Sequence, residues 1–445
     1  MKYSLLTIAI LFFTKISFAQ PTYYATYSNA PYSGSGIIGD VGYPGLFAKT
    51  TSGDLIGMTG SNGGTDKIIF KINESTGTMA WKKLYSPGET LSLMSMVGTS
   101  DNCAACLFVS FNAGYTAVVC KIDASGNILW TEGLNNGSYS SFSSMVPTSD
   151  GGVVISGGGC LGTDMILHIG ANGNIISQKA HYGTLNGYVV YNNDMVVDAN
   201  NQYSCWGYRF VSGSVNGNPF AFYQTDSSGN IASITVLDCN GYGANTWAGG
   251  AKLLCRANNG AHYGVQPMNT PGNPSHKMVV CYFNAANQFV WARHINIASD
   301  SAANPMSIIG TDDNGCIVAI SRMHDLGPYH STAFIKFDMT GNTVWTKCVG
   351  DITSSQWRYD DLGSMINNGN GSIDLFMNHV FAIDMVKANQ QLDGFCTYQS
   401  FSPVITNITP TITTDVMGSF NTNFQIVALN WPSVTQSLST YFECI

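Results

Sequence analysis

Short apolar or alternating stretches, separated by turns rich in Gly, Asn and Asp, recur along most of the chain. Two kinds of turn alternate. The first has the form TSDGG, as at 148–152, and the second has the form SGN before an apolar pair and Trp, as in KIDASGNILW at 121–130. Gly, Asn and Asp supply the positive φ angles of tight hairpins. The pattern therefore predicts short antiparallel strands joined by hairpins.

The second turn also defines an internal repeat. Its anchor positions, which lie roughly 50 residues apart, are Gly77, Gly126, Gly173, Gly229, Asn287, Gly341 and Asn389. Each unit consists of strand A, the first turn, strand B, a loop, strand C, the second turn and strand D. Four antiparallel strands in such a unit are typical of one β-propeller blade.

Seven units predict an all-β, seven-bladed β-propeller of four-stranded blades over 20–400. Residues 23–28 resemble a strand D placed before the first strand A, and we expect them to pair with the last blade and close the ring. Residues 401–445 lack the repeat; they either close the propeller or form a small appendage. Together with 23–28 they could instead build a composite eighth blade. A series of β-sandwich modules is the other alternative, although such modules rarely repeat one pair of turns.

The repeat resembles that of secreted β-propeller proteins of Bacteroidota. The likeness covers about 45–400, and the segments that carry it are TSDGGVVISGG (148–158), KIDASGNILW (121–130) and KFDMTGNTVWTK (336–347). It implies the propeller fold and export, and it says little about activity. Many members of that group carry a C-terminal type IX sorting domain, whereas this sequence shows no motif of that kind.

The N-terminal residues 1–19 have the pattern of a secretory signal peptide. Lys2 precedes an apolar stretch over 5–13, and a small-x-small site follows at 17–19. No later stretch approaches the 18 apolar residues expected of a transmembrane helix. We therefore expect a secreted or cell-surface protein without a transmembrane segment.

Charged residues make up only 10% of the chain, against about 25% in an average domain. With 19 basic and 27 acidic side chains, the surface does not favour nucleic acid or anionic lipid. Polar character must come from Gly, Asn, Ser and Thr, which leaves few groups for acid–base chemistry.

Twelve cysteines in an exported chain predict disulfides. Cys106 and Cys120 are symmetric about Ala113, the centre of an expected hairpin, so they should face each other within disulfide reach. Cys396 and Cys444 bracket the C-terminal segment and could tie it to the last blade. Cys103-x-x-Cys106 has no second ligand pair, so we expect no metal and no other cofactor.

The order of strands assigns two faces to the disc. The short turns within each blade lie on one face, whereas the B–C loops and the links between blades lie on the other, which we call the loop-rich face. Loops held by a rigid scaffold commonly carry function, and aromatic side chains among neutral polar groups suit glycans or proteins. The expected ligand-binding residues are Tyr139, Tyr182, Tyr242, Trp247, Tyr329, Trp357 and Tyr359.

These features predict an exported, non-catalytic binding or adhesion propeller whose partner is a glycan or a protein. No catalytic residues are assigned. One alternative is a polysaccharide lyase or hydrolase on the same face, where acid–base groups could come from His324, Asp325, His330, Arg358, Asp360 and Asp361. Another is a structural surface or matrix protein. Methionines of the inner strands, and tryptophans that recur four residues after a turn anchor, are interpreted as packing.

Overall fold

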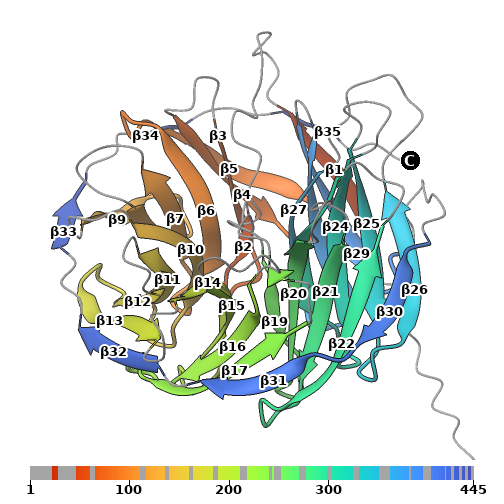
Figure 1. Cartoon of the computed structure of the whole chain (residues 1–445). Coiled ribbons are helices and arrows are strands. Elements are labelled where there is room, and N and C mark those ends of the chain that lie inside the picture. Colours follow the sequence, from red (N-terminus) through yellow and green to blue (C-terminus); the bar gives the residue numbers. More distant parts are fainter. Residues whose placement is uncertain are drawn as a thin grey trace, which may run out of the picture.

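The computed structural model of the chain is a ring of β-sheets arranged around one axis (Figure 1). It describes residues 23–28, 47–60, 66–110, 117–135, 140–159, 164–183, 189–210, 218–239, 243–244, 252–269, 277–297, 302–323, 330–349, 361–379, 382–393, 402–415, 417–421, 425–429, 433–435 and 439–441. Within these ranges the regular structure is entirely β. They contain no helix that could cross a membrane.

Seven antiparallel sheets form seven blades, which confirms the predicted seven-bladed propeller. Blade 1 consists of β2 (Phe47–Lys49), β3 (Leu55–Gly60), β4 (Lys67–Asn73) and β5 (Thr78–Tyr85). Blade 2 consists of β6 (Leu91–Gly98), β7 (Ala104–Ser110), β8 (Ala117–Ile122) and β9 (Ile128–Asn135). Blade 3 consists of β10 (Ser140–Pro147), β11 (Val153–Gly159), β12 (Asp164–Ile169) and β13 (Ile175–Gly183). Blade 4 consists of β14 (Val189–Val197), β15 (Tyr203–Phe210), β16 (Phe220–Thr225) and β17 (Ile231–Asp238).

The remaining three blades follow the same plan, with two variations. In blade 5 the inner position is shared by β18 (Gly243–Ala244) and β19 (Leu254–Arg256), followed by β20 (His262–Asn269), β21 (Lys277–Phe283) and β22 (Phe289–Asn296). Blade 6 consists of β23 (Ala302–Gly310), β24 (Cys316–Met323), β25 (His330–Phe337) and β26 (Thr343–Val349). Blade 7 takes β27 (Asp361–Asn367), β28 (Ser372–His379) and β29 (Ala382–Asn389) from the end of the repeat. Its fourth strand comes from elsewhere in the chain.

That fourth strand is β1 (Tyr23–Ser28), which pairs antiparallel with β29 from Tyr23 opposite Lys387 to Ser28 opposite Ala382. The expected pairing of 23–28 with the last blade is therefore confirmed. Blade 7 is built from two ends of the repeat region, and this pairing joins the ring without leaving the outer edge of β29 open.

The C-terminal segment forms a belt around the outside of the ring (Figure 1). Its strands are β30 (Val404–Ile408) on blade 5, β31 (Thr411–Asp415) on blade 4, β32 (Met417–Asn421) on blade 3, β33 (Gln425–Ala428) on blade 2, β34 (Ser433–Thr435) on blade 1 and β35 (Ser439–Tyr441) on blade 7. Each adds an outermost antiparallel strand to an existing blade. The composite eighth blade is therefore not formed, because these strands satisfy the outer edges of blades that are already complete.

The repeated second turn is held by its own side chains. Asp123 accepts hydrogen bonds at Oδ1 from the amides of Ser125 and Asn127, each at 2.8 Å, and Asn127 Nδ2 donates to Asp123 Oδ2 at 2.9 Å. Gly126 has a φ of 77°, a conformation that favours glycine. The motif DxxGN thus specifies the hairpin locally, through an Asx-type turn.

The recurring tryptophans join one blade to the next. Trp81 Nε1 donates to the carbonyl of Ala124 at 2.9 Å, and Trp130 Nε1 donates to the carbonyl of Ala171 at 2.8 Å. In both cases the acceptor lies in the second turn of the following blade. The expectation that these residues pack between blades is confirmed.

Scarce lysines of strand C neutralise acidic residues of the first turn in the same blade. Ammonium–carboxylate distances are 2.7 Å for Lys71 with Asp54, 2.5 Å for Lys121 with Asp101 and 2.7 Å for Lys336 with Asp313. Lys121 and Lys336 are almost completely buried. Several of the few charges in the chain therefore stabilise the repeat. In blade 2, for example, the Lys of KID pairs with the Asp of TSD.

Candidate functional site

Inner strands of five blades carry a β-bulge at the same place, one residue before a polar side chain. The residue after the bulge is Ser in four blades and Asp in the fifth. These residues are Ser95, Ser144, Asp194, Ser307 and Ser364. A bulge places two residues opposite one and turns the side chains locally. Five repeats of this device produce a polar ring on the inner strands.

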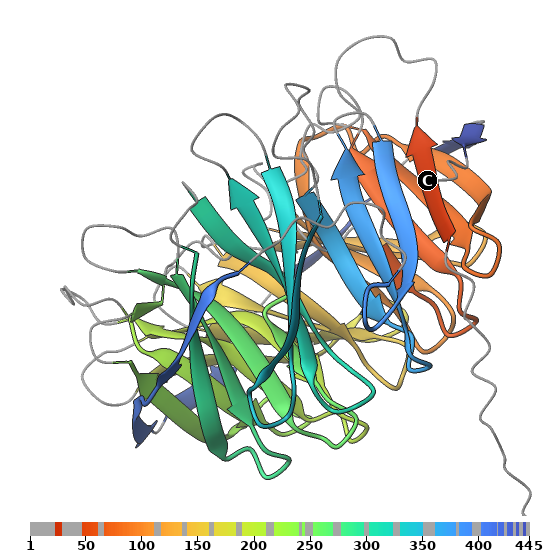
Figure 2. The same cartoon turned by 90° about the vertical axis from the view of Figure 1, so that its right-hand side faces the viewer.

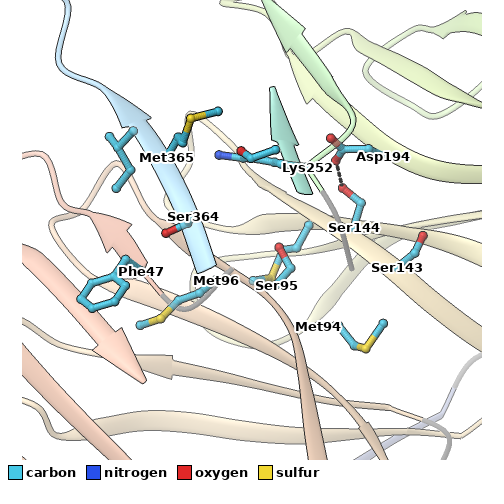
Figure 3. Close-up of a pocket in the computed structure, with 13 residues that line it drawn as sticks. Phe47, Met94, Ser95, Met96, Ser143, Ser144, Asp194, Lys252, Ser364 and Met365 are labelled. Carbon is cyan, nitrogen blue, oxygen red and sulfur yellow. Dashed lines mark hydrogen bonds between the residues drawn. The ribbon is translucent and has the colours of Figure 1, made fainter. Parts of the chain in front are cut away.

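The polar ring lines a cavity on the axis, to which all seven blades contribute (Figure 3). Phe47 of blade 1 and Lys252 of blade 5 complete the wall. The cavity volume is about 30 Å³, which is enough for one or two waters or a small ion but not for a sugar ring. The axis itself is therefore not the place where a glycan chain would sit.

Methionines line the cavity together with the polar ring. Met94, Met96, Met145 and Met365 line the same cavity and are buried. Their interpretation as inner packing is confirmed by this burial. They also give the cavity a weakly polar wall, which strengthens electrostatic interactions inside it.

Asp194 is the one carboxylate of the cavity wall, and hydrogen-bond donors surround it. Oδ1 accepts from Ser144 Oγ at 2.7 Å and from the Met195 amide at 2.8 Å, while Oδ2 accepts from the amides of Leu253 and Leu254 at 2.7 and 2.8 Å. Burial raises the pKa of Asp194, and the hydrogen bonds from Ser144 and the amides oppose that rise. The four donors come from blades 3, 4 and 5, so Asp194 connects three blades and has little capacity left to act as a base.

Two hydroxyl groups of the ring have no hydrogen-bond partner among the residues that the structure describes. Ser307 Oγ and Ser364 Oγ are buried and unpaired, and the two residues are 0% and 5% exposed. Lys252, by contrast, is exposed on the cavity wall. The bulge and the Ser after it carry no obvious sequence signal.

The two faces of the disc follow the predicted strand order. The A–B and C–D hairpins lie along one side, at the bottom of Figure 2. The opposite ends of the strands lead into the B–C loops and the links between blades. Of the seven aromatic residues expected there, six lie outside the described residues: Tyr139, Tyr242, Trp247, Tyr329, Trp357 and Tyr359.

The seventh, Tyr182, belongs to strand β13 rather than to a loop, and it pairs with Gly418 of the belt. Among the acid–base candidates, His330 begins β25 and Asp361 begins β27. The others, His324, Asp325, Arg358 and Asp360, lie outside the described residues. The described residues therefore include the strands that carry the loop-rich face but not the side chains expected to form its site.

The predicted register of Cys106 and Cys120 is confirmed, but the disulfide between them is not formed. They are directly opposed in β7 and β8, and both are free and 0% exposed. Burial and the neighbouring Cys120 raise the pKa of Cys106 well above its ordinary value, which suppresses the reactive thiolate. Both sulfurs pack in the core as small apolar groups. Cys396 and Cys444 lie outside the described residues.

A buried polar network that sequence reasoning missed joins blades 3 and 4. Tyr223 donates to Asp164 Oδ2, His181 Nδ1 lies 3.8 Å from the same oxygen, and His181 Nε2 lies 2.7 Å from the Gly229 carbonyl. Burial raises the pKa of Asp164, against the effects of His181 and Tyr223. All three side chains are fully buried, so the network stabilises the blade interface rather than contacting a ligand.

Searches for similar proteins found neither a family model nor a curated protein that matches the chain. Similar solved structures include a protein of unknown function from Bacteroides caccae, with 12% identity and a TM-score of 0.37 over 74% of this chain and 94% of that one. The polysaccharide lyase Uly1 has 9% identity and a TM-score of 0.48 over 82% and 97% of the two chains. A subtype N10 neuraminidase-like protein of A/little yellow-shouldered bat/Guatemala/060/2010 has 9% identity and a TM-score of 0.40 over 64% and 91%. Similarity this low does not indicate what the chain binds.

Proposed function

We propose that this protein is an exported binding propeller that holds a glycan or a protein partner on its loop-rich face. The observation that carries the proposal is the division of the disc into two faces. Every described hairpin within a blade lies on one face, and the strand ends that lead into the B–C loops and the links between blades lie on the other (Figure 2). A rigid ring that presents many loops from one side is a common basis for recognition.

The composition of those loops supports a neutral, aromatic binding surface. They contain Tyr242, Trp247, Trp357 and Tyr359 among Asn, Ser and Gly. Aromatic rings with nearby amide and hydroxyl groups recognise sugar faces and protein surfaces. Binding is favoured over catalysis because the carboxylate identified at the axis, Asp194, is already surrounded by four donors.

We also propose that the protein is secreted or located at the cell surface. Residues 1–19 have the pattern of a cleaved signal peptide, and the repeat resembles that of secreted propellers. A mature chain that starts at Gln20 is the form in which binding should be measured. Amino-terminal sequencing of the exported protein tests the cleavage site.

The test of binding uses the mature chain on a glycan array and as bait against extracellular proteins. We expect one saturable partner class, and we expect Trp247→Ala or Trp357→Ala to weaken its binding at least tenfold. Leu129→Ala is the matched control, because Leu129 is 52% exposed on the outer strand β9, next to the short hairpin turn. If no partner binds, or if both Trp variants bind like the unchanged chain, the proposal is wrong.

A further inference from the structure

The axial cavity carries an excess of hydrogen-bond donors on three consecutive blades. Lys252 belongs to blade 5, Ser307 to blade 6 and Ser364 to blade 7. Lys252 and Ser307 are paired in a parallel β-bridge, and the Ile308 amide donates to the Lys252 carbonyl at 2.9 Å. The bulge of the next blade brings Ser364 to the same cavity. An ammonium and two hydroxyl groups therefore line the cavity on neighbouring blades.

The two hydroxyl groups of this set lack a partner in the described part of the chain. Ser307 Oγ and Ser364 Oγ are buried without a hydrogen bond, and an unpaired buried hydroxyl group costs about 1–3 kcal/mol. Both residues are more than nine-tenths buried and both line the cavity. Buried hydroxyl groups are normally hydrogen-bonded, so a molecule bound in the cavity would satisfy both of them.

Within the described residues Asp194 and Lys252 make no direct ion pair, although, against the rise that burial causes, the charge of Lys252 lowers the pKa of Asp194. Asp194 receives four other hydrogen bonds, and in Figure 3 the Lys252 side chain extends away from it, toward the strand that carries Ser364 and Met365. Within the described residues, Lys252 Nζ makes no ion pair. Its positive charge is therefore directed into a cavity whose unpaired hydroxyl groups can also donate.

We infer that the axial cavity binds one small oxyanion, a carboxylate or phosphate-type group, through Lys252 Nζ, Ser307 Oγ and Ser364 Oγ. An ammonium with hydroxyl donors is a suitable set for an oxyanion, and charge-assisted hydrogen bonds are the stronger kind. A cavity volume of about 30 Å³ admits a single small group. This site is distinct from the loop-rich face and can exist whether or not that face binds a glycan.

A metal cation fits the cavity less well. The oxygens of Asp194, which would be the strongest ligands for a cation, are all engaged by donors, and Lys252 would repel a positive ion. Water would also satisfy the two hydroxyl groups, and no anion is required to balance Lys252, because Lys252 is exposed and its charge already acts on Asp194. Water occupancy is therefore the outcome that the experiment must distinguish from an anion.

The first experiment is crystallographic and uses the unchanged mature chain. Crystals soaked in selenate, at constant ionic strength against a chloride control, should show an anomalous selenium peak within hydrogen-bond distance of Lys252 Nζ and Ser307 Oγ. A peak that disappears when an equal concentration of phosphate or acetate is added identifies a shared oxyanion site. A cavity that contains only water in both crystals would overturn the inference.

The second experiment measures affinity by isothermal titration calorimetry with inorganic phosphate, sulfate and acetate in turn. We expect saturable one-to-one binding that Lys252→Met weakens at least tenfold and that Ser307→Ala weakens about threefold to tenfold. Lys83→Met is the matched control. Lys83 lies on strand β5, so this substitution removes the same charge away from the cavity. The anion that binds with the highest affinity shows whether the natural ligand carries a phosphate-type group or a carboxylate. Equal binding by Lys252→Met and Lys83→Met, or binding only at crystallisation concentrations as an adventitious ion, would contradict the site.

Discussion

Lys387 and Glu74 are separated by 313 residues in the sequence, yet Lys387 Nζ lies 2.6 Å from Glu74 Oε1. Lys49 Nζ approaches the other oxygen of the same carboxylate at 2.7 Å. Blade 7 has no Asp in its first turn, so the lysine of its strand C uses Glu74 of blade 1 instead. Glu74 therefore joins the first and last blades electrostatically, at the seam where the ring closes.

Glu74→Gln should destabilise the protein by about 3 kcal/mol at neutral pH, because it removes the carboxylate that pairs with both Lys387 and Lys49. Burial opposes ionisation of Glu74, but Lys387 and Lys49 hold its pKa below the ordinary value. The stabilisation should therefore be present at neutral pH and disappear as the pH falls below about 4. Urea unfolding at a series of pH values measures both effects.

Asp393→Asn is the matched control for that variant. Asp393 also pairs with a lysine, Lys347, at 3.3 Å, but its side chain is 67% exposed. Exposed ion pairs contribute little, so this variant should stay within about 0.5 kcal/mol of the unchanged protein. Equal stabilities of Glu74→Gln and Asp393→Asn would show that the seam does not depend on the buried charges.

Asp374 lies in the same region and should make stability fall between pH 4 and pH 6. Burial, with a smaller effect of Glu74, raises its pKa to about 6. A carboxyl group whose pKa is raised on folding favours the folded state at low pH, and that advantage is lost as the pH rises through the folded-state pKa. Two pKa units correspond to at most about 3 kcal/mol.

Asp374→Asn should remove this decline, so that its stability relative to the unchanged protein increases from pH 4 to pH 7. Urea unfolding of both proteins, with Asp393→Asn as a second reference, gives the difference directly. A decline of the same size in Asp374→Asn would assign the effect to another group.

Trp130→Phe should cost about 1–2 kcal/mol, since it removes the hydrogen bond from Nε1 to the Ala171 carbonyl between blades 2 and 3. The neighbouring Leu129 is 52% exposed, and Leu129→Ala should change stability by less than about 0.5 kcal/mol. Thermal or urea unfolding compares these adjacent substitutions. If Leu129→Ala lowered stability more than Trp130→Phe, the hydrogen bond of Trp130 would not be the more important contact of this part of β9.

The features that were predicted correctly from the sequence depend on residues close together in the chain or in adjacent repeats. Asp123, Gly126 and Trp130 act within one hairpin or on the next one, so their spacing is visible in a single repeat. The closing strand 23–28 was also predictable, because a ring of repeats needs a partner for its last edge. Each of these features either recurs in several repeats or follows from the closure of the ring of blades.

Features that depend on three-dimensional neighbours were not predictable in the same way. The contact of Glu74 with Lys387 requires that the first and last blades meet, and the bulge before Ser307 leaves no turn motif in the sequence. The belt was hidden for a similar reason. Its strands are only three to five residues long, and each finds its partner on a different blade.

The belt leads to the last prediction, which concerns the order in which the ring is secured. The belt visits blades 5, 4, 3, 2, 1 and 7 in turn, so it can dock completely only when those blades have formed. Its final strand β35 pairs with β1, which is itself held against β29. The N-terminal strand therefore lies between two strands from the C-terminal part of the chain.

Ending the chain after residue 435 removes β35 and should leave the ring folded but speed amide hydrogen exchange in 23–28. Ending it after residue 401 removes the whole belt and exposes the outer edges of six blades. Open strand edges promote pairing between chains, so this shorter chain should also self-associate. Hydrogen exchange followed by mass spectrometry measures the first effect, and light scattering measures the second. A chain ending at 401 that stays monomeric, with exchange in 23–28 no faster than in the full chain, would show that the belt does not secure the ring.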